Sequence, residues 1–283
     1  MSKTRPSKPR DFGNQFYFRS FGVTICVESN RKKLLERARE LVSDAFGNKA
    51  KLIPNGGMGM TPRFRLEASG EVLALYRNGS LLDSGRSERH FLQFLNSSLR
   101  LEVAEHAKSR VFIHSGVVGW RGNAILIPGI SFAGKSTLTA ELVGNGAEYY
   151  SDEYAVIDKN GKVGPFPRLI SLRRPGDFGE TAVSPEELGG VQGKHSIPVG
   201  MVLFTRYRRG ARWKPEILKP GAGIMDLIPN TLSMRKDPAF SLKVLDLVAQ
   251  RAIMVRSPRG DARKFAKFLL DFFDNHTKLA KMT

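Results

Sequence analysis

The sequence has few cysteines, no long apolar run and a shortage of acidic residues. Cys26 is the single cysteine of the 283 residues, so no disulfide can form within the chain. No apolar run approaches the ~20 residues that cross a bilayer, and the first residues lack the apolar core of a secretory signal. We therefore expect a protein of the reducing cytoplasm that makes no membrane contact. Cys26 lies in an apolar stretch, residues 23–27, which favours packing over a nucleophilic role.

The shortage of acid leaves the chain strongly basic. Lysine and arginine number 45 against 27 acidic residues, which gives a formal net charge of +18. The excess gathers in three segments: 1–10, 206–219 and 251–267. Such charge fits an acidic partner: nucleic acid, an acidic peptide or nucleotide phosphates. The simpler explanation is a basic protein with solvated charged surfaces. No homeodomain, zinc-finger or RNA-recognition motif accompanies it, so nucleic acid is a hypothesis without a motif.

The length allows one large domain or two of ordinary size. Residues 1–14 are polar, basic and contain two prolines, and predict a flexible arm. Residues 15–108 predict an α+β region in which residues 15–27 form a strand, Asn30 caps a helix, and Asn78-Gly79 turns a hairpin. Residues 109–283 predict an α/β nucleotide domain. Within it, residues 174–196 carry proline, glycine and charge without periodicity, and predict a mobile loop near the site.

One stretch carries a specific signal for chemistry, the nine residues 129–137. They fit the P-loop pattern G-x-x-x-x-G-K-[ST], in which backbone N–H groups hold phosphate oxygens. The lysine would reach the β- and γ-phosphates and the following serine would bind Mg²⁺. The predicted phosphate-binding residues are Gly129, Ser131, Ala133, Gly134, Lys135, Ser136 and Thr137.

The residues on either side of this stretch support the assignment. Residues 123–128 form a short apolar run typical of a buried strand, and residues 136–143 are apolar on one helical face. Strand, glycine loop and helix N-terminus together place an anion at the positive end of a helix. The alternative is a glycine-rich turn without a ligand. The motif in this context favours a nucleoside triphosphate, ATP with Mg²⁺.

Three further side chains are candidates for the chemistry. Asp152 and Glu153 follow an apparent strand one helix beyond the loop, where carboxylates could bind metal or accept a proton. A solvated turn pair is the alternative for them. His114 lies inside an apolar run, where a histidine is often a hydrogen-bonded core residue. Arg168, Arg173 and Arg174 could meet phosphate charge, although surface arginines are common.

Three stretches together resemble a known family. His114-Ser115-Gly116-Val117-Val118-Gly119, then residues 129–137, then Tyr150-Ser151-Asp152-Glu153, are similar to the C-terminal kinase domain of HPr kinase/phosphorylase. That family shares a P-loop topology with the ATP-dependent phosphoenolpyruvate carboxykinases. The order and spacing match over residues 109–158. The resemblance implies an α/β fold: a P-loop nucleotide-binding domain of HPr kinase/phosphoenolpyruvate carboxykinase type, preceded by the small α+β region.

The resemblance also implies roles for individual residues. His114 corresponds to the family's active-site histidine, Lys135 to the phosphate-binding lysine and Ser136 to the magnesium ligand. Asp152-Glu153 stands where the family has Asp-Asp, so one acid would accept the substrate's proton, and Glu153 is also a candidate metal ligand. The family's later glutamate-arginine-glycine signature is not recognisable here; residues 165–173 stand in its place. The chain therefore resembles the divergent relatives, some of which phosphorylate other substrates such as a peptide terminus.

These observations lead to one main hypothesis and two alternatives. The main one is an ATP- and Mg²⁺-dependent serine kinase whose acceptor is a hydroxyl of a protein, a peptide or a small molecule, with Asp152, Glu153, His114 and Lys135 as the catalytic residues. The first alternative is a module whose affinity for nucleic acid or an acidic partner is switched by nucleotide. The second is a protein that binds ATP without phosphotransfer. Nothing in the sequence excludes a homo-oligomer.

Overall fold

The computed structural model describes residues 14–54, 61–130, 133–166, 168–172 and 181–279. Contacts between residues divide the chain into two compact units, Met1–Val103 and Ala104–Thr283. The division falls inside a helix, a few residues before residue 108, where we predict the boundary between the α+β region and the nucleotide domain. The position of that boundary stays a prediction. The predicted arm lies almost wholly outside the described residues. In the described parts, no helix is both long and apolar enough to cross a membrane.

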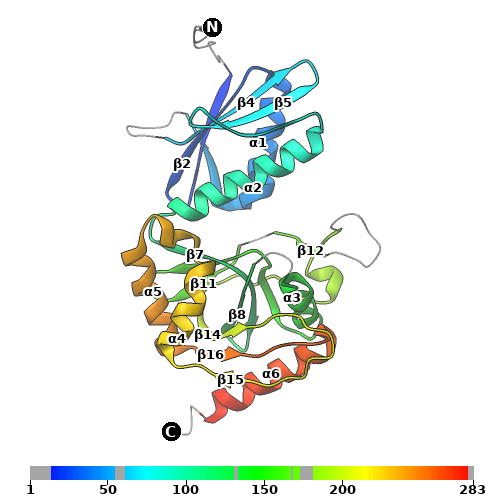
Figure 1. Ribbon diagram of the computed structural model, residues 1–283, viewed down its shortest axis with the longest axis vertical. Coiled ribbons are helices and arrows are strands. Elements are labelled where there is room, and N and C mark those ends of the chain that lie inside the picture. Colours follow the sequence, from blue (N-terminus) through cyan, green and yellow to red (C-terminus); the bar gives the residue numbers. More distant parts are fainter. Residues whose placement is uncertain (1–13, 55–60, 131–132, 167, 173–180, 280–283) are drawn as a thin grey trace, which may run out of the picture. The chain divides into compact units, whose positions relative to one another are not determined.

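Unit 1 is a six-stranded sheet with two long helices, α1 and α2 (Figure 1). Strands β1, β4 and β5 alternate buried with exposed or half-exposed side chains, as a sheet with one covered face requires; Phe16 and Phe18 of β1 are examples. The sheet order is β3-β1-β2-β4-β5-β6. The elements are β1 (Gln15–Ser20), β2 (Val23–Ser29), α1 (Lys32–Phe46), η1 (Gly47–Lys49), β3 (Ala50–Ile53), β4 (Arg63–Ser69), β5 (Val72–Arg77), β6 (Ser80–Gly85) and α2 (Glu88–His106).

Two local predictions in unit 1 are wrong and one is confirmed. Residues 15–27 are not one strand but most of a hairpin, because Phe21 and Gly22 both have positive φ and turn the chain. Asn30 does not cap α1; its side chain instead bonds the backbone of Ala68 through both its oxygen and its nitrogen. Asn78-Gly79 does form the predicted turn, with φ of 49° and 86°.

Unit 2 contains a mixed sheet of eight strands with helices on both faces, an α/β fold. Its path runs β11-β10-β7-β8-β14-β16-β15, β9 pairs with β7, and β11 also pairs with β14. The elements are β7 (Arg110–Trp120), β8 (Asn123–Pro128), α3 (Lys135–Gly144), β9 (Glu148–Ser151), β10 (Tyr154–Asp158), β11 (Lys162–Gly164), β12 (Ile170–Leu172), β13 (Thr181–Val183), η2 (Glu186–Leu188), β14 (Ile197–Phe204), β15 (Glu216–Ile217), α4 (Pro220–Leu227), η3 (Ile228–Asn230), η4 (Leu232–Arg235), α5 (Pro238–Arg251), β16 (Ile253–Arg256) and α6 (Ala262–Leu279).

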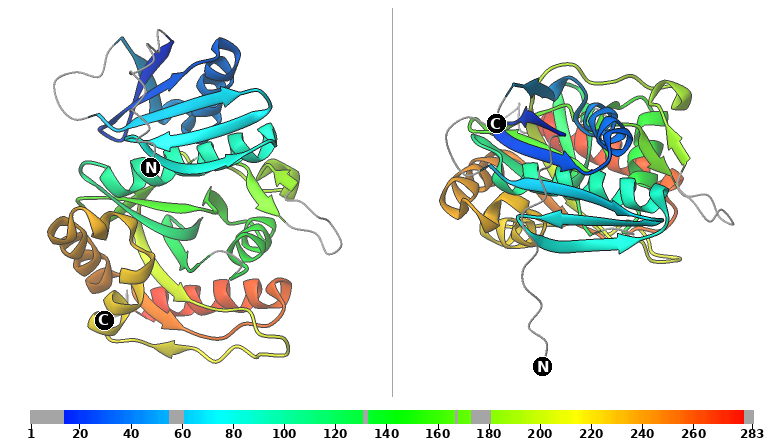
Figure 2. Two further views of the ribbon diagram at one scale, coloured as in Figure 1. Left: turned by 45° about the horizontal axis from the view of Figure 1, so that its top comes forward. Right: turned by 90° about the horizontal axis from the view of Figure 1, so that it is seen from above.

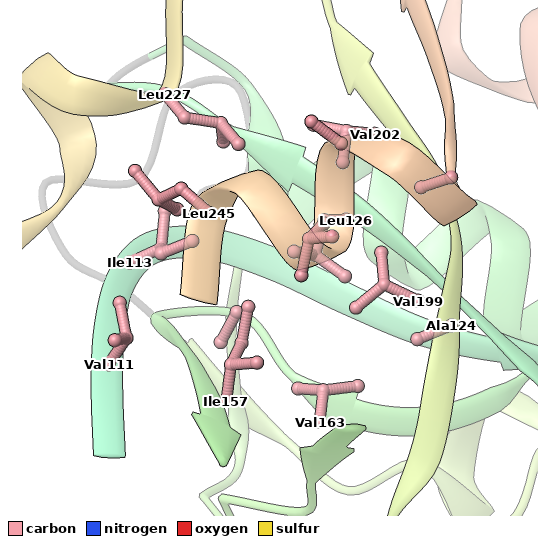
Figure 3. Close-up of a cluster of buried hydrophobic side chains, with 14 of the residues drawn as sticks. Val111, Ile113, Ala124, Leu126, Ile157, Val163, Val199, Val202, Leu227 and Leu245 are labelled. Carbon is pink, nitrogen blue, oxygen red and sulfur yellow. The ribbon is translucent and has the colours of Figure 1, made fainter. Parts of the chain in front are cut away.

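The central strand β8 is buried on both faces and separates two cores. Ala124 and Leu126 point to the side of α4 and α5, where they pack with Leu227 and Leu245 (Figure 3). Ile125 and Ile127 point to the other side and pack with α3 and α6. Figure 2 shows the same separation of the helices of unit 2. This double burial explains why β8 is a continuous apolar run.

Strand direction decides which loops share an edge of the sheet. Strands β8, β14 and β16 are mutually parallel, and β9 and β10 both run antiparallel to β7, which is antiparallel to β8. The carboxyl ends of β8, β9, β14 and β16 therefore point the same way. In α/β folds ligands bind at this edge.

The stretch predicted to be a mobile loop, residues 174–196, is only partly described. Its described part contains β13, paired with β12, and the short helix η2. The stretch is therefore not a loop throughout, because residues 181–183 and 186–188 have regular structure, and its mobility stays a prediction. Residues 174–180 lie outside the described residues.

Candidate functional site

The glycine-rich stretch joins β8 to α3 at the carboxyl edge of the sheet. The N–H of Gly129 donates to the carbonyl oxygen of His114 at 3.2 Å, which ties the start of the stretch to β7. At its other end Gly134 has φ of 81° and directly precedes α3. The N–H groups of a first helical turn have no partner within the helix, so they are available to an anion. Ser131 lies outside the described residues.

Lys135 is the first residue of α3 and is 7% exposed. Its Nζ donates to the carbonyl oxygen of Ile130 at 2.8 Å. Burial lowers the pKa of Lys135 to about 8, against the opposing charges of Asp152 and Glu153. The side chain therefore lies near the predicted acids, whose charges favour its protonated form.

Ser136 and Thr137 follow on the first turn of α3. Ser136 is half-buried, and its hydroxyl makes no hydrogen bond with another residue in the described part of the chain. Thr137 is exposed. Ser136 is thus the better placed of the two to offer an oxygen to a cation.

Asp152 and Glu153 form the tight link between β9 and β10. The Ser151 hydroxyl accepts hydrogen bonds from the N–H groups of Glu153 and Tyr154, at 3.1 and 3.0 Å, which shapes this turn. The N–H of Ser115 donates to the carbonyl oxygen of Glu153 at 3.0 Å, so the turn is fixed to β7. Both carboxylates therefore lie at the edge of the sheet where β8 ends.

The Asp152 carboxylate is buried, with 7% of the residue exposed. The Tyr149 hydroxyl donates to one of its oxygens at 3.2 Å and the N–H of Ser171 donates to the other at 2.8 Å. Burial raises the pKa of Asp152, although the Ser171 N–H and the Arg168 charge both oppose the rise. A carboxylate with a raised pKa is a better proton acceptor than an ordinary one.

Glu153 forms an ion pair with Arg168, whose guanidinium donates to its carboxylate. Burial on its own lowers the pKa of Arg168, but the charges of Glu153 and Asp152 outweigh it and the pKa is raised. Arg168 is thus held by the acids of the site. Arg173 and Arg174, the other arginines considered for phosphate contact, lie outside the described residues.

His114 lies in β7 opposite Tyr154 of β10 and is half-buried. The pKa of His114 is lowered to about 4, mainly by burial and also by the Lys135 charge, while the Glu153 charge opposes both. The imidazole is therefore neutral at pH ~7. It can accept or donate a hydrogen bond in the site but does not supply a positive charge.

Electrostatic coupling shows which predicted residues the fold brings together. Lys135 interacts with Asp152 and Glu153, and His114 interacts with Lys135 and Glu153. These four groups come from β7, from the start of α3 and from the β9–β10 link. Thr137, exposed on α3, takes no part in this set.

Two residues of the site were not predicted from the sequence. Arg259, which follows β16, is 2% exposed and donates through Nη2 to the carbonyl oxygen of Gly134 at 2.7 Å. Tyr207, which follows β14, pairs with Arg259 through a β-bridge. Both residues directly follow apolar strands, which is a signal in the sequence. Using it requires knowing that these two strands are parallel neighbours in the sheet, which the sequence does not show.

The donor atoms fit a hard cation held jointly with phosphate. In the described residues there is no group of three or more His, Cys, Asp or Glu side chains that could hold a metal. Mg²⁺ in nucleotide sites needs only one or two protein oxygens besides phosphates and water. The Ser136 hydroxyl and the Glu153 carboxylate are oxygen donors of this kind.

No protein-family model matches the chain and no curated protein matches it. Among solved structures, it is similar to the HPr(Ser) kinase/phosphatase from Coxiella burnetii. That match has 14% sequence identity and a TM-score of 0.30, and covers 60% of this chain and 98% of that chain.

Proposed function

We propose that this chain binds ATP with Mg²⁺ and transfers the γ-phosphoryl group to a serine-type hydroxyl of a protein, a peptide or a small molecule. The observation that carries the proposal is Lys135, which is buried as the first residue of α3 and lies close enough to Asp152 and Glu153 for their charges to act on it. A buried lysine at a helix N-terminus suits phosphate, and an adjacent carboxylate suits removal of a hydroxyl proton. The motif resemblance over residues 109–158 supports the same reaction and the nucleotide fold of HPr kinase type.

The proposed roles follow from the environment of each side chain. Lys135 and the free N–H groups of the first turn of α3 would bind the phosphates, where a fixed positive field stabilises charge in the transition state. Asp152, whose pKa is raised by burial, would accept the acceptor's proton. Glu153 would bind the cation together with Ser136. Mg²⁺, when bound, would neutralise charge on the phosphates.

His114 and Arg168 would complete the arrangement without taking part in proton transfer. The carbonyl oxygen of His114 accepts a hydrogen bond from the N–H of Gly129. The imidazole of His114, whose pKa is lowered, would line the site as a neutral hydrogen-bonding group. Arg168 would hold the Glu153 carboxylate in place through their ion pair. Both would therefore act by positioning the loop and the acids.

The test uses labelled ATP and an extract that contains candidate acceptors. The wild-type protein should transfer label to an acceptor and bind a fluorescent ATP analogue. Lys135→Ala should lose transfer by about 10²-fold or more, since it removes a preorganised charge from the transition state. Lys159→Ala, an exposed lysine on the turn after β10, is the matched control and should behave as wild type. Wild-type transfer by Lys135→Ala would refute the site assignment.

A second function is favoured by the basic segment 206–214. Its charged side chains are Arg206, Arg208, Arg209, Arg212 and Lys214. All five residues are exposed, and the segment leaves the carboxyl end of β14, beside β8 in the sheet. This surface would suit a nucleic acid or an acidic partner whose binding responds to nucleotide. A steep loss of oligonucleotide binding with salt, different with and without ATP, would support it. Binding of ATP without transfer or partner binding would leave the chain an ATP-binding protein only.

A further inference from the structure

Arg259 is a buried cation in the segment between β16 and α6. The residue is 2% exposed, and burying a charge is costly unless other groups compensate it. An arginine remains protonated in proteins, so it cannot relieve this cost by losing its proton. The groups around Arg259 should therefore show how its charge is compensated.

The described partners of this guanidinium are carbonyl oxygens and an aromatic ring. Nη2 donates to the carbonyl oxygens of Gly134 at 2.7 Å and Ala133 at 3.5 Å, and Nη1 donates to that of Gly260 at 3.3 Å. Its Cζ lies 5.6 Å from the ring centroid of Tyr207. Nε is buried without a hydrogen-bond partner, and no carboxylate pairs with this side chain in the described part of the chain.

The charges near Arg259 do not compensate its burial. Tyr207 and Asp261 act to raise its pKa, but burial is the largest effect and the pKa of Arg259 is lowered. Asp261 is engaged elsewhere, since its carboxylate accepts from the N–H of Lys264 at 3.2 Å. Within the described residues, this buried guanidinium thus lacks a full counter-charge.

The backbone of Arg259 is fixed from both directions. Its N–H donates to the carbonyl oxygen of Arg206 at 3.2 Å, and its own carbonyl oxygen accepts from the N–H of Arg208 at 2.8 Å. The turn after β16 is therefore joined to the segment after β14. These two backbone hydrogen bonds fix the position of Arg259, and a group that positions a loop must itself be fixed.

Peptide geometry converts this contact into an orientation of the loop. In a planar trans peptide the carbonyl oxygen and the following N–H point in opposite directions. When Arg259 holds the carbonyl oxygens of Ala133 and Gly134, the N–H groups of Gly134 and Lys135 point away from the guanidinium. A Cβ built on Gly134 would collide with Nη2 of Arg259, so the contact also requires glycine there.

We infer that Arg259 is a positioning residue of the phosphate loop. It binds the carbonyl side of the loop, turns the N–H side toward the phosphates, and adds a fixed positive charge that the triphosphate balances. The inference rests on the proposed function, because it assumes that this loop binds a nucleoside triphosphate. It assigns to phosphate binding a residue 125 positions away from Gly134 in the chain.

The experiment measures binding of a fluorescent ATP analogue and the ATP dependence of transfer. The variants are Arg259→Met, Arg259→Lys, Lys135→Met and Arg256→Met. Arg256 is the matched control: it ends β16, and its exposed guanidinium pairs with Asp226 and Glu216. Arg259→Met should raise the Kd at least about tenfold, and the KM for ATP should rise more than kcat falls, because the phosphates are bound less well from the start. Arg259→Lys should lie between Met and wild type, because it keeps the charge but not the planar fork.

The outcomes separate the inference from the proposed function. If Arg259→Met binds the analogue as wild type does while Lys135→Met loses binding, the positioning role is wrong and the proposed function stands. If the wild-type protein itself neither binds the analogue nor transfers phosphate, the proposed function fails. Should Arg259→Met not fold, Arg259→Lys decides: wild-type affinity in that folded variant overturns the role, and weakened affinity with an unchanged Arg256→Met control supports it.

Discussion

The side-chain nitrogen of Lys135 donates a hydrogen bond to the backbone oxygen of Ile130 at 2.8 Å, across the loop that separates β8 from α3. A lysine that is 7% exposed thus has a neutral carbonyl as its hydrogen-bond acceptor, with the acids Asp152 and Glu153 near enough to act on its charge. An incoming phosphate would compete with that carbonyl and offer a full negative charge in its place.

ATP affinity should fall as the pH rises through about 8, the lowered pKa of Lys135. Below that pH the ammonium is charged and attracts phosphate; above it the free protein must take up a proton to bind equally well. The Kd should therefore rise by up to about tenfold per pH unit above the pKa. Titration of a fluorescent ATP analogue between pH ~7.5 and ~9.5 measures this. Lys135→Arg, which stays charged, should give a flat profile; a flat wild-type profile would contradict the assignment.

Stability should fall in acid because of His114. Its pKa is lowered from 6.5 to about 4 in the folded protein, so the unfolded chain binds more protons between these values. The contribution of this group to the free energy of unfolding is therefore fully present above pH 6.5 and is lost as the pH falls toward 4. Urea unfolding across this range should show a shallower decline for His114→Gln than for wild type. His195→Gln, at an exposed histidine, is the control; equal slopes in all three proteins would count against burial of the neutral ring.

Substitution of Asp152 and of Glu153 should affect different steps of the reaction. Asp152→Asn should lower the transfer rate by about 10² to 10⁴-fold, the usual contribution of general base catalysis, while the Kd for nucleotide changes little. Glu153→Gln should instead raise the Mg²⁺ concentration needed for half-maximal rate, because it weakens an oxygen ligand. Circular dichroism checks that both variants fold. The reverse pattern, with Glu153→Gln losing the rate and Asp152→Asn the metal dependence, would exchange the two roles.

Gly116 should be sensitive to the smallest enlargement. A Cβ there would lie 2.5 Å from the Thr139 hydroxyl and 3.8 Å from Cβ of Lys135, so α3 would have to move from β7. Gly116→Ala should cost about 1–3 kcal/mol of unfolding free energy, as overpacked cores do, and should weaken nucleotide binding. The control is Gly221→Ala in α4, where nothing lies within 4 Å of the new Cβ. That variant should be neutral or gain up to about 1 kcal/mol. Equal stability of the two variants would show that β7 and α3 adapt freely.

Local sequence patterns determined the elements around the site. Residues 123–128 formed the predicted strand and α3 began at Lys135, because a buried apolar run and a glycine before a helix are signals within a few residues. Helix α5 begins on a local signal of the same kind, since the Asp237 side chain accepts from the N–H of Phe240 as an N-cap. The Asn78-Gly79 hairpin has the same kind of local cause.

Local patterns predicted the structure wrongly where tertiary contacts or a turn override them. Asn30 has the chemistry of a cap, but in the tertiary structure the backbone of Ala68 is a better partner for its amide. Residues 15–27 are rich in β-branched and aromatic side chains on both sides of the turn at Phe21 and Gly22, so the composition alone suggested one strand. Helix α4 contains two glycines, which disfavour a helix locally, but Gly223 is needed because Met254 packs against it.

The sequence by itself determined the local chemistry: a glycine-rich loop after a buried strand, a lysine at the start of a helix, and two acids after the next strand. Only the tertiary structure decided which groups meet. It joined Arg168 to Glu153, buried Asp152 against Tyr149 and Ser171, and placed Arg259 behind the loop. The physical reason is that strand order and direction set which loops share an edge, and they depend on how whole sheets bury their faces. The pKa values of Lys135 and His114 follow from that burial, so no reading of neighbouring residues could supply them.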